Sequence, residues 1–489
     1  MKKNFSVVLI YPPKKHQVAS QTPSFAHKEF VNYPPMGLLY LAGMFKDDPL
    51  VDIEVIDCQV KLQYIDQLME HLGEKKPNVI GITLISNLLY SSYQILREIR
   101  KNLPDTHVLV GGPHATIYPL EILESRLVDF VFTGDAEYSF HRMITLFQEG
   151  QGHLEAELKD IPGLAWIDNT GSLQHSPNSS HQKLKLDDIP FPDRGKLDHV
   201  AYGNPANIGE QTAYILTSRG CPFRCNFCDI PHKNYLFRDH KNVVDEMEEL
   251  QAFGFDEIMI LDDTFNIQID RVEEICHEIL RRNLKIRWVG RGRVAPFTES
   301  LAVLLKKAGC YRFHVGVESG SDDMLKQIGK KITLTMVRDF FTICRGHNID
   351  TLAYFIIGFP DETESQIQET IKFAQEINPE YIYFSILSLF PNTAVYTQAI
   401  DQGVVTGDTW REFAKSPTEY WKIPLWTQTI SEKRLHQLLR QSYRKFYFSF
   451  GYIMRLLGKN LRSPSMILHT GKIGARMLRY VVSRSGGFD

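Results

Sequence analysis

Two series of short apolar runs, each alternating with amphipathic segments, constrain the fold of this chain more than any other feature. The runs of the first series are Ser6–Tyr11, Asp52–Asp57, Val79–Thr83, His107–Val110 and Phe130–Phe132. Helical patterns such as Leu89–Lys101 and Glu137–Gln148 follow individual runs. This rhythm is typical of a parallel, doubly wound sheet with helices on both faces. We therefore predict an α/β domain of the doubly wound type over residues 1–150.

The second series begins at Thr212 and ends near Pro391. Its candidate strands are Ala213–Thr217, Glu257–Leu261, Ile286–Gly290, Arg312–Val317, Leu352–Ile357 and Tyr381–Ile386. Its candidate helices are Val243–Phe253, Arg271–Arg282, Leu301–Ala308, Thr335–Arg345 and Glu364–Glu376. Six strand–helix units are too few for an eight-fold barrel, so they favour an incomplete parallel barrel. We predict a partial (β/α)6 barrel over residues 212–400.

The remaining segments differ in composition from these two series. Residues 151–211 are polar and rich in Ser, Pro and Asp, which predicts a linker with small β elements. Residues 401–489 have a helical pattern, and Lys433–Asp489 contains twelve Lys or Arg against one acid, although the whole chain has a net charge of −3. The charge of this basic region is compatible with an anionic substrate, a membrane surface or nucleic acid nearby. The alternative is a helical cap whose long basic side chains cover apolar surface.

The overall composition excludes a largely disordered chain, because 43% of the residues are hydrophobic and 23% are charged. We find no apolar run long enough for a transmembrane helix. The chain begins with Met1–Asn4 and continues directly into Phe5–Ile10, which is too short for the core of a signal peptide. We therefore expect a cytoplasmic protein. The chain has 7 cysteines, and an odd number argues against a disulfide framework.

Three cysteines, Cys221, Cys225 and Cys228, lie directly after the first strand of the second series with the spacing C-x3-C-x2-C. Thiolates are soft ligands that suit iron–sulfur clusters or zinc. Three of them leave one iron of a [4Fe-4S] cluster open for a chelating substrate. The amino and carboxylate groups of S-adenosylmethionine (SAM) chelate iron in this way, and an electron from the cluster then releases a 5′-deoxyadenosyl radical. The pattern therefore favours a radical enzyme.

A structural zinc site is the alternative for the same cysteines. Zinc sites usually combine two cysteine pairs, or one pair with further Cys or His ligands. Asp229 or His232 is available as a fourth ligand, but the sequence holds no second C-x2-C pair. The cysteines also follow a barrel strand, where active sites gather. An iron–sulfur cluster is therefore favoured, and a zinc-stabilised binding protein remains the non-enzymatic alternative.

The cysteine motif, with Phe227 just before its third member, resembles the radical SAM superfamily. This resemblance implies that SAM binds at successive strand ends of the barrel. The residues concerned would be Phe227, Asp262, Asp263, Glu318, Ser319, Gly358, Phe359 and Pro360. The sequence departs from the family where a G-x-I-x-G-x-x-E pattern would put its glycine at Tyr354 and its glutamate at Asp361. It also has Asp262-Asp263 where Gly-Gly-Glu is usual.

These segments also have structural interpretations. The acids of Asp262–Thr264 are typical of a helix N-terminus, and Glu318 is expected to pair with Arg312 or Arg291 in a structural ion pair. Cys276, Cys310 and Cys344 have apolar neighbours, which favours core positions.

Three pieces of the first domain, Tyr33–Ala42, Gly111–His114 and Gly134–Glu137, resemble the cobalamin-binding radical SAM proteins. That group includes C-methyltransferases and is similar to the anaerobic magnesium-protoporphyrin IX monomethyl ester cyclase. The resemblance implies that cobalamin binds at the strand ends. The candidate residues are Ser86, Gly111, Gly112, Gly134 and Glu137. The motif D-x-H-x-x-G is absent, so we expect no protein imidazole on the cobalt. The alternative is a domain that has lost cobalamin and serves as a partner or lid.

Together the two resemblances imply a radical SAM methyltransferase that uses a [4Fe-4S] cluster, SAM and cobalamin to methylate a carbon of an organic substrate. The alternative is oxidative cyclisation or rearrangement of a tetrapyrrole-like substrate without methyl transfer. The expected partners are a small-molecule substrate and a one-electron reductant such as flavodoxin or ferredoxin, with no nucleic acid. Aromatic residues in Tyr381–Phe384 and Tyr443–Tyr452, near Arg444 and Lys445, predict either a pocket for a flat or apolar anion or ordinary core packing.

Overall fold

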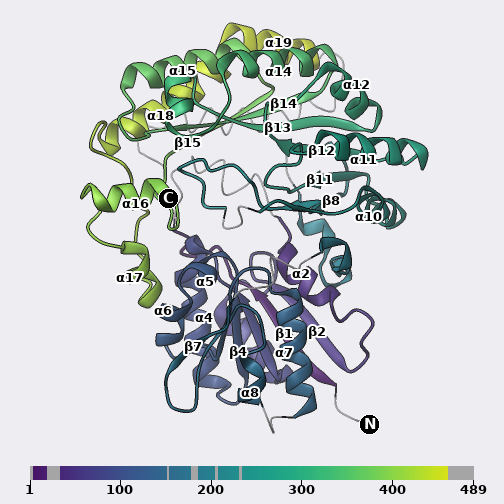
Figure 1. Cartoon of the computed structure of the whole chain (residues 1–489), viewed down its shortest axis with the longest axis vertical. Coiled ribbons are helices and arrows are strands. Elements are labelled where there is room, and N and C mark those ends of the chain that lie inside the picture. The colour runs from purple at the N-terminus through teal and green to yellow at the C-terminus, as the bar shows by residue number, and fades with distance from the viewer. Residues whose placement is uncertain are drawn as a thin grey trace. The chain divides into compact units, whose positions relative to one another are not determined.

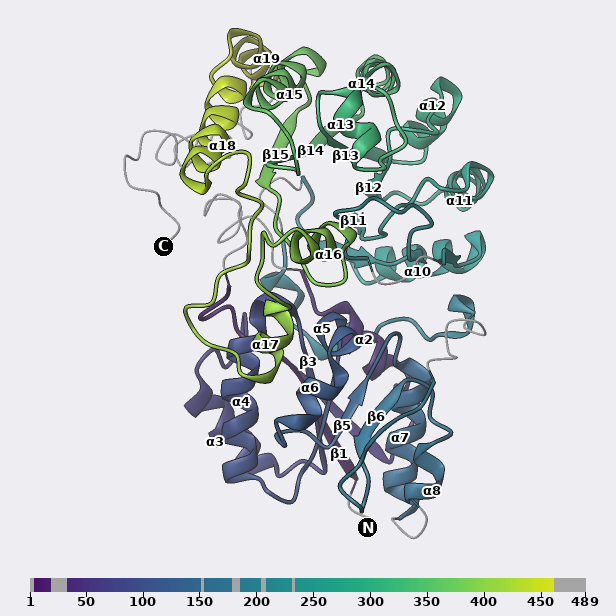
Figure 2. The same ribbon diagram turned by 60° about the vertical axis from the view of Figure 1, so that its left-hand side comes forward.

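A computed structural model describes residues 4–18, 33–150, 154–177, 185–203, 208–230 and 234–460 of the chain. Its contacts divide the chain into two units. The first comprises residues 1–19, 33–201 and 406–422, and the second comprises residues 20–32, 202–405 and 423–489. Figures 1 and 2 show the elements of each unit.

The first unit is built on a seven-stranded sheet in the order β2-β1-β3-β4-β5-β6-β7. The strands are β1 (Phe5–Tyr11), β2 (Val51–Asp57), β3 (Val79–Thr83), β4 (His107–Gly111), β5 (Phe130–Phe132), β6 (Leu164–Ile167) and β7 (Leu173–His175). The helices include α2 (Met36–Gly43), α3 (Ile65–Lys75), α4 (Leu89–Asn102), α5 (Pro113–Ile117), α6 (Pro119–Glu124), α7 (Glu137–Glu149) and α8 (Leu154–Leu158). β1 to β5 pair in parallel. Because helices cover both faces of the sheet, β1, which lies between β2 and β3, holds an unbroken buried run, Val7–Ile10.

Two segments outside residues 1–150 also belong to this unit. β6 and β7 lie in the stretch that the sequence suggested as a linker, and they extend the sheet in antiparallel pairing. α17 (Thr409–Lys415) lies in the region predicted as a helical C-terminal part. It packs on the first unit, where Trp410 is fully buried and the Tyr93 hydroxyl donates to the carbonyl of Ala414 at 2.6 Å. The sequence predicted small β elements in the first segment and a helical pattern in the second, but it does not encode which sheet they join.

The second unit holds a six-stranded parallel sheet in the order β15-β14-β13-β12-β11-β8. The strands are β8 (Thr212–Ile215), β11 (Glu257–Ile260), β12 (Arg287–Gly292), β13 (Cys310–Glu318), β14 (Asp350–Ile357) and β15 (Tyr381–Ile386). The helices that follow strands are α10 (His240–Ala252), α11 (Ile269–Arg281), α12 (Glu299–Lys307), α13 (Asp322–Gln327), α14 (Leu334–Gly346), α15 (Glu364–Ile377) and α16 (Ala394–Asp401). Strands adjacent in sequence are adjacent in space, and the first and last do not pair. This confirms the predicted partial barrel.

The open edge of this barrel is covered by α18 (Glu432–Tyr447), which is followed by α19 (Phe450–Asn460). The Tyr443 hydroxyl accepts from the N–H of Phe384 at 2.9 Å and donates to its carbonyl at 3.0 Å. Tyr447 binds Ile382 in the same two ways, at 3.2 and 3.3 Å. These hydroxyls take the place of a seventh strand. The aromatic residues of α18 therefore pack on the sheet edge, as the core-packing alternative required.

The basic region is described only as far as residue 460, and residues 461–489 lie outside the described part of the chain. Across the described ranges, none of the helices combines the length and apolar character needed to cross a membrane.

Candidate cofactor sites at the strand ends

The cysteine-bearing loop leaves the carboxyl end of β8 through a short antiparallel pair, β9 (Ser218–Arg219) with β10 (Leu236–Phe237). Gly220 has a φ of +80° and turns the chain into the loop. Cys221 follows and is buried, with its Sγ 3.4 Å from the Oγ1 of Thr264. The first predicted ligand therefore lies against the end of the neighbouring strand.

The other two cysteines are half-buried. Cys225 Sγ lies 3.8 Å from the carbonyl oxygen of Gly329, and the N–H of Cys228 donates to the carbonyl of Cys225 at 3.2 Å in a tight turn. Phe227 lies in this turn, and its ring meets Phe359 edge-to-face with 5.6 Å between centroids. The structure thus brings the cysteine loop and the segment after β14 together.

The donor set of this loop fits an iron–sulfur cluster. None of the three cysteines is in a disulfide with another described residue, and they lie on a loop tethered at Gly220 and Cys221. Within the described ranges, no three His, Cys, Asp or Glu side chains are grouped as ligands of one metal ion. A four-iron cluster does not need that convergence, because each thiolate binds a different iron. Of the two residues suggested as a fourth zinc ligand, Asp229 is described, whereas His232 lies outside the described residues.

Two acids after β11 hold the residues that precede Cys221. Asp262 is fully buried and accepts from the N–H of Thr217 at 2.6 Å and from the hydroxyls of Thr217 and Ser218, both at 2.5 Å. Asp263 is exposed and accepts from the N–H of Gly220 at 3.1 Å. Desolvation by the surrounding protein raises the pKa of Asp263, although Arg291 opposes this. The suggested helix N-terminus at Asp262–Thr264 is wrong, because α11 begins only at Ile269.

Glu318 lies at the carboxyl end of β13 in a left-handed conformation with a φ of +71°. Its carboxylate binds Lys330 at 2.6 Å, and both side chains are buried. The pairing register between β13 and β14 shifts between Gly316 and Glu318. A Cβ at Gly316 would lie 2.0 Å from the Glu318 carboxylate, so this glycine makes room for the ion pair. Glu318 therefore pairs with Lys330, whereas the sequence suggested Arg312 or Arg291.

Ser319 follows Glu318 and is fully buried. Its hydroxyl lies 3.3 Å from the hydroxyl of Thr370 on α15, and it accepts from the N–H of Ser321 at 3.2 Å. Both contacts stabilise the turn after β13, so the Ser319 hydroxyl holds the conformation of that turn.

The turn after β14 is held by an acid that sequence reasoning missed. Gly358 has a φ of +86°, and the N–H groups of Gly358 and Phe359 donate to Glu362 Oε2 at 2.6 and 3.1 Å. Glu362 is fully buried, which raises its pKa to about 7, and its Oε1 has no hydrogen-bond partner among the described residues. The family pattern pointed one position earlier, to exposed Asp361. The carbonyl of Pro360 accepts from Gln327 at 3.0 Å.

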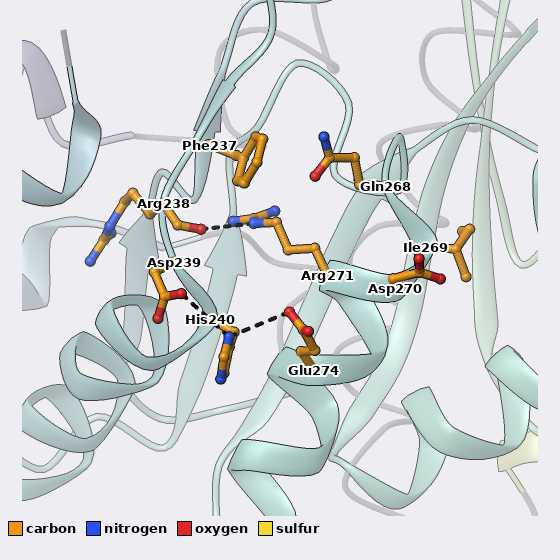
Figure 3. Close-up of a pocket in the computed structure, with 9 residues that line it drawn as sticks. All are labelled: Phe237, Arg238, Asp239, His240, Gln268, Ile269, Asp270, Arg271 and Glu274. Atoms are coloured by element: carbon orange, nitrogen blue, oxygen red, sulfur yellow. Dashed lines mark hydrogen bonds and ion pairs between the residues drawn. The ribbon is translucent and has the colours of Figure 1, made fainter.

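A pocket beside the cysteine loop contains side chains that hold the carboxyl end of β8 (Figure 3). It is lined by Phe237, Arg238, Asp239, His240, Gln268, Ile269, Asp270, Arg271 and Glu274. The Arg271 guanidinium donates to the carbonyls of Arg238 and Thr217 at 2.8 and 2.7 Å and lies over the Phe237 ring. His240 lies between Asp239 and Glu274, at 3.5 and 3.4 Å. Arg271 therefore joins α11 to the end of β8.

In the first unit, the loops after β3, β4 and β5 meet at one edge of the sheet. The N–H of Leu84 donates to Gly111 at 2.7 Å, and the N–H of Gly134 donates to the hydroxyl of Thr116 at 3.0 Å. Gly112 has a φ of +100°, and a Cβ there would lie 2.7 Å from Thr83 Oγ1. Because Gly111, Gly112 and Gly134 have no side chains, the backbone at these strand ends is accessible. We call the three loop segments the glycine-lined cradle, and it fits a cofactor that approaches the backbone closely.

Two further candidates lie beside this cradle. Ser86 Oγ is 3.0 Å from Nδ1 of His114, and Glu137 is buried in the first turn of α7. His114 is fully buried near the rings of Tyr118 and Trp410, and this burial lowers its pKa to about 3. The imidazole is therefore neutral and enclosed by these rings.

Two family models match the chain. The model described as the radical SAM superfamily matches residues 215–374, which lie in the second unit. The model described as the B12 binding domain matches residues 30–144, most of which lie in the first.

Several curated proteins are similar to this chain over most of its length. An uncharacterized methyltransferase of Pyrococcus horikoshii is 30% identical over 426 residues, covering 85% of this chain and 88% of the relative. The anaerobic magnesium-protoporphyrin IX monomethyl ester cyclase of Rubrivivax gelatinosus is 28% identical over 380 residues, covering 76% and 67%. The cytidylyl-2-hydroxyethylphosphonate methyltransferase of Streptomyces wedmorensis is 27% identical over 381 residues, covering 70% of each.

Two solved structures have a similar fold. The radical S-adenosylmethionine methyltransferase TsrM from Kitasatospora setae, solved with cobalamin and a [4Fe-4S] cluster, matches with a TM-score of 0.65 and 22% identity over 82% of this chain and 78% of that one. The cobalamin-dependent radical enzyme OxsB, solved with aqua-cobalamin and SAM, matches with a TM-score of 0.70 and 16% identity over 98% and 71%. At these identities the likeness shows a shared fold.

Proposed function

This chain belongs to the radical SAM superfamily, in the group whose members carry a B12-binding domain, and from this premise we propose that it methylates a carbon atom of an organic substrate. The observation that carries the proposal is the combination in one chain of a tethered three-cysteine loop and a glycine-lined cradle of the B12-binding type. When bound, the cluster supplies the electron that cleaves SAM, and cobalamin carries the methyl group from a second SAM.

Different residues of the second unit would hold the cluster, orient the cysteine loop and contact SAM. Cys221, Cys225 and Cys228 would hold the cluster. Asp262 and Arg271 would orient the end of β8, from which the loop leaves. The remaining candidates would contact SAM, either through side chains that reach the strand-end turns or through the turn backbone. They are Phe227, Asp263, Glu318, Ser319, Gly358, Phe359 and Pro360.

The first unit would hold cobalamin. Gly111, Gly112 and Gly134 would let the corrinoid approach the backbone, with Ser86 and Glu137 beside them. A one-electron donor such as flavodoxin or ferredoxin would reduce the cluster.

Product analysis tests the proposal. The full chain, reconstituted anaerobically with iron, sulfide and hydroxocobalamin, is incubated with SAM labelled in its methyl group and a chemical reductant. A cell extract fractionated by size supplies candidate substrates. We expect label in a small-molecule product, together with 5′-deoxyadenosine if hydrogen abstraction is the route. The triple Cys→Ala variant is the control. Equal label from that variant would contradict the proposal.

Oxidative cyclisation is the second candidate, because the chain is also similar to magnesium-protoporphyrin cyclases of two further organisms. The two functions differ in the fate of the label. Cyclisation consumes SAM without moving its methyl group into the product, whereas methylation transfers it. A product that forms without label would therefore favour the cyclase.

A further inference from the structure

The helix-free face of the barrel sheet carries a polar group that the proposed function leaves unassigned. Helices cover the other face (Figure 1). On that covered face Phe355 of β14 and Phe384 of β15 stack at 4.6 Å, and Phe384 meets Tyr443 of α18. Because successive side chains of a strand point to opposite faces, Tyr354 and Tyr383 point to the helix-free face. Both are half-buried, and their rings meet with 5.7 Å between centroids.

Arg291 and His314 lie on the same face. Gly290 and Gly292, the neighbours of Arg291 in β12, are positioned against the ring of Phe313, which packs on Phe340 of α14. Arg291 therefore points away from the helices, and it is exposed. Strand pairing sets Arg291 of β12 directly beside His314 of β13.

His314 has an unsatisfied group inside this face. It is 3% exposed, its Nδ1 lies 3.4 Å from the Tyr354 hydroxyl, and its Nε2 has no hydrogen-bond partner among the described residues. The Tyr354 hydroxyl is a donor that can bind Nδ1 of the neutral imidazole. We assign the remaining ring proton to Nε2, which makes Nε2 a buried donor without an acceptor.

Two guanidinium groups act on this donor, although Asp263 also faces Arg291, and Asp350 and Glu257 face Arg312. Burial, Arg312 and Arg291 all lower the pKa of His314, so the imidazole is neutral and lies in the field of two guanidinium groups. Glu318 lies nearby, but its charge is balanced by Lys330 at 2.6 Å. An unsatisfied N–H donor beside guanidinium groups favours an anionic oxygen as its acceptor.

We propose that Arg291, His314 and Tyr354 form a binding face for a flat, unsaturated substrate that carries a carboxylate. The carboxylate accepts from Nε2 of His314 and from Arg291, and the rings of Tyr354 and Tyr383 contact the flat carbon skeleton. The inference rests on the proposed function, because it names the substrate class for that site. Tyr354 stands where the family pattern has glycine, so it would narrow the choice of substrate in this chain.

A matched pair of fluorescent probes tests this binding face without turnover. The probes are 1-pyrenecarboxylate and 1-pyrenemethanol, which share one flat ring system and differ in charge. Each is titrated against the anaerobically reconstituted full chain, with saturating SAM present, and binding is followed by fluorescence anisotropy. We expect the wild-type chain to prefer the carboxylate by about tenfold, the range of a charge-assisted hydrogen bond.

Variants locate the source of the preference. Arg291→Met should abolish it, and Tyr354→Phe should reduce it several-fold while leaving 1-pyrenemethanol binding unchanged. Arg287→Met is the control, because Arg287 is an exposed arginine at the other end of the same strand. No preference in the wild-type chain, or an equal preference in Arg291→Met, would overturn the proposal.

Competition distinguishes substrate from cofactor. If the carboxylate preference appears only when SAM is left out, Arg291 binds the SAM carboxylate and the substrate assignment is overturned. Probe binding is also independent of catalysis. A chain that binds the carboxylate through Arg291 but transfers no methyl group would refute the proposed function and leave the binding face standing. A chain that transfers the methyl group but shows no preference for the carboxylate through Arg291 would refute the binding face alone.

Discussion

The carboxylate of Asp262 accepts from both the backbone N–H and the hydroxyl of Thr217, at 2.6 and 2.5 Å, and so ties the end of β11 to the end of β8. With Ser218 as a third donor, one buried acid fixes the point from which the cysteine loop begins. Asp262→Ala should leave three buried donors unsatisfied, at a cost of about 3 kcal/mol or more.

Urea unfolding and iron content after anaerobic reconstitution measure this effect. We expect lower stability and less iron bound per chain. Asp263→Ala is the matched control, since the exposed neighbour accepts only from Gly220 in the described contacts, at 3.1 Å. If both variants behave alike, Asp262 does not have the anchoring role described here.

The seven cysteines should fall into two classes when each is replaced by alanine. Cys221, Cys225 and Cys228 lie on one tethered loop, so each replacement should remove most of the bound iron and the visible absorption of the reconstituted chain. Cys276 is fully buried in α11. Its replacement should lower stability by about 1–2 kcal/mol through lost packing but leave the iron content unchanged. Iron retained in the loop variants, or zinc in its place, would contradict the cluster assignment.

Glu362 should make the stability of the chain depend on pH. Its pKa is raised from 4.5 to about 7 in the folded state. Between these values the folded state holds a proton that the unfolded state has released, so stability falls as pH rises from about 4.5 to 7. The difference of the two pKa values corresponds to about 3 kcal/mol.

Glu362→Gln should remove this part of the pH dependence, because the amide oxygen still accepts from Gly358 and Phe359 but does not titrate. The measurement is urea unfolding at several pH values. The control is Asp361→Asn, which changes the exposed neighbour and should keep the wild-type slope. A slope in the Gln variant equal to that of the wild type would show that another group is responsible.

The class of both units, the residues of most of their strands and the place of the cysteine loop after the first barrel strand were predictable from the sequence. Each rests on local information, such as the apolar runs Val79–Thr83 and Tyr381–Ile386, which the structure reproduces residue for residue. The three cysteines were predictable as a group because a short loop brings them together by chain connectivity alone.

Contacts between distant segments were not predictable in this way. The pairing of Glu318 with Lys330 depends on the turn after β13, and the role of Glu362 depends on a glycine in a left-handed conformation. α17 carries no local signal of the sheet on which it packs. The aromatic pattern of α18 is compatible with a pocket lining or with core packing, and the contacts of the tyrosine hydroxyls with the backbone of β15 decide for packing.

Those tyrosine hydroxyls give a further prediction. Tyr443→Phe keeps the ring but leaves the N–H and the carbonyl of Phe384 without their partner, at a cost of about 1–3 kcal/mol. The carbonyl partner of Tyr452 is more distant, at 3.4 Å from its hydroxyl, so Tyr452→Phe should cost less. Urea unfolding measures both variants. A smaller loss for Tyr443→Phe than for Tyr452→Phe would contradict the edge-closing role of Tyr443.

A comparison of alanine variants at Gly112 and Gly150 distinguishes the cost of backbone strain from the cost of crowding at the glycine-lined cradle. Both have a left-handed φ, +100° and +96°, but a Cβ at Gly112 would lie 2.7 Å from Thr83 Oγ1, whereas a Cβ at Gly150 would meet nothing within 4 Å. Gly150→Ala should therefore lower stability only by the backbone strain of about 1 kcal/mol, and Gly112→Ala should lower it more because the strand-end loops must also move.

Retained corrinoid is measured from the visible spectrum after reconstitution and gel filtration. We expect Gly112→Ala to lose most of it and Gly150→Ala to keep the wild-type amount, because only Gly112 lies among the loops that would bind the cofactor. Equal retention would mean that the cradle does not hold cobalamin.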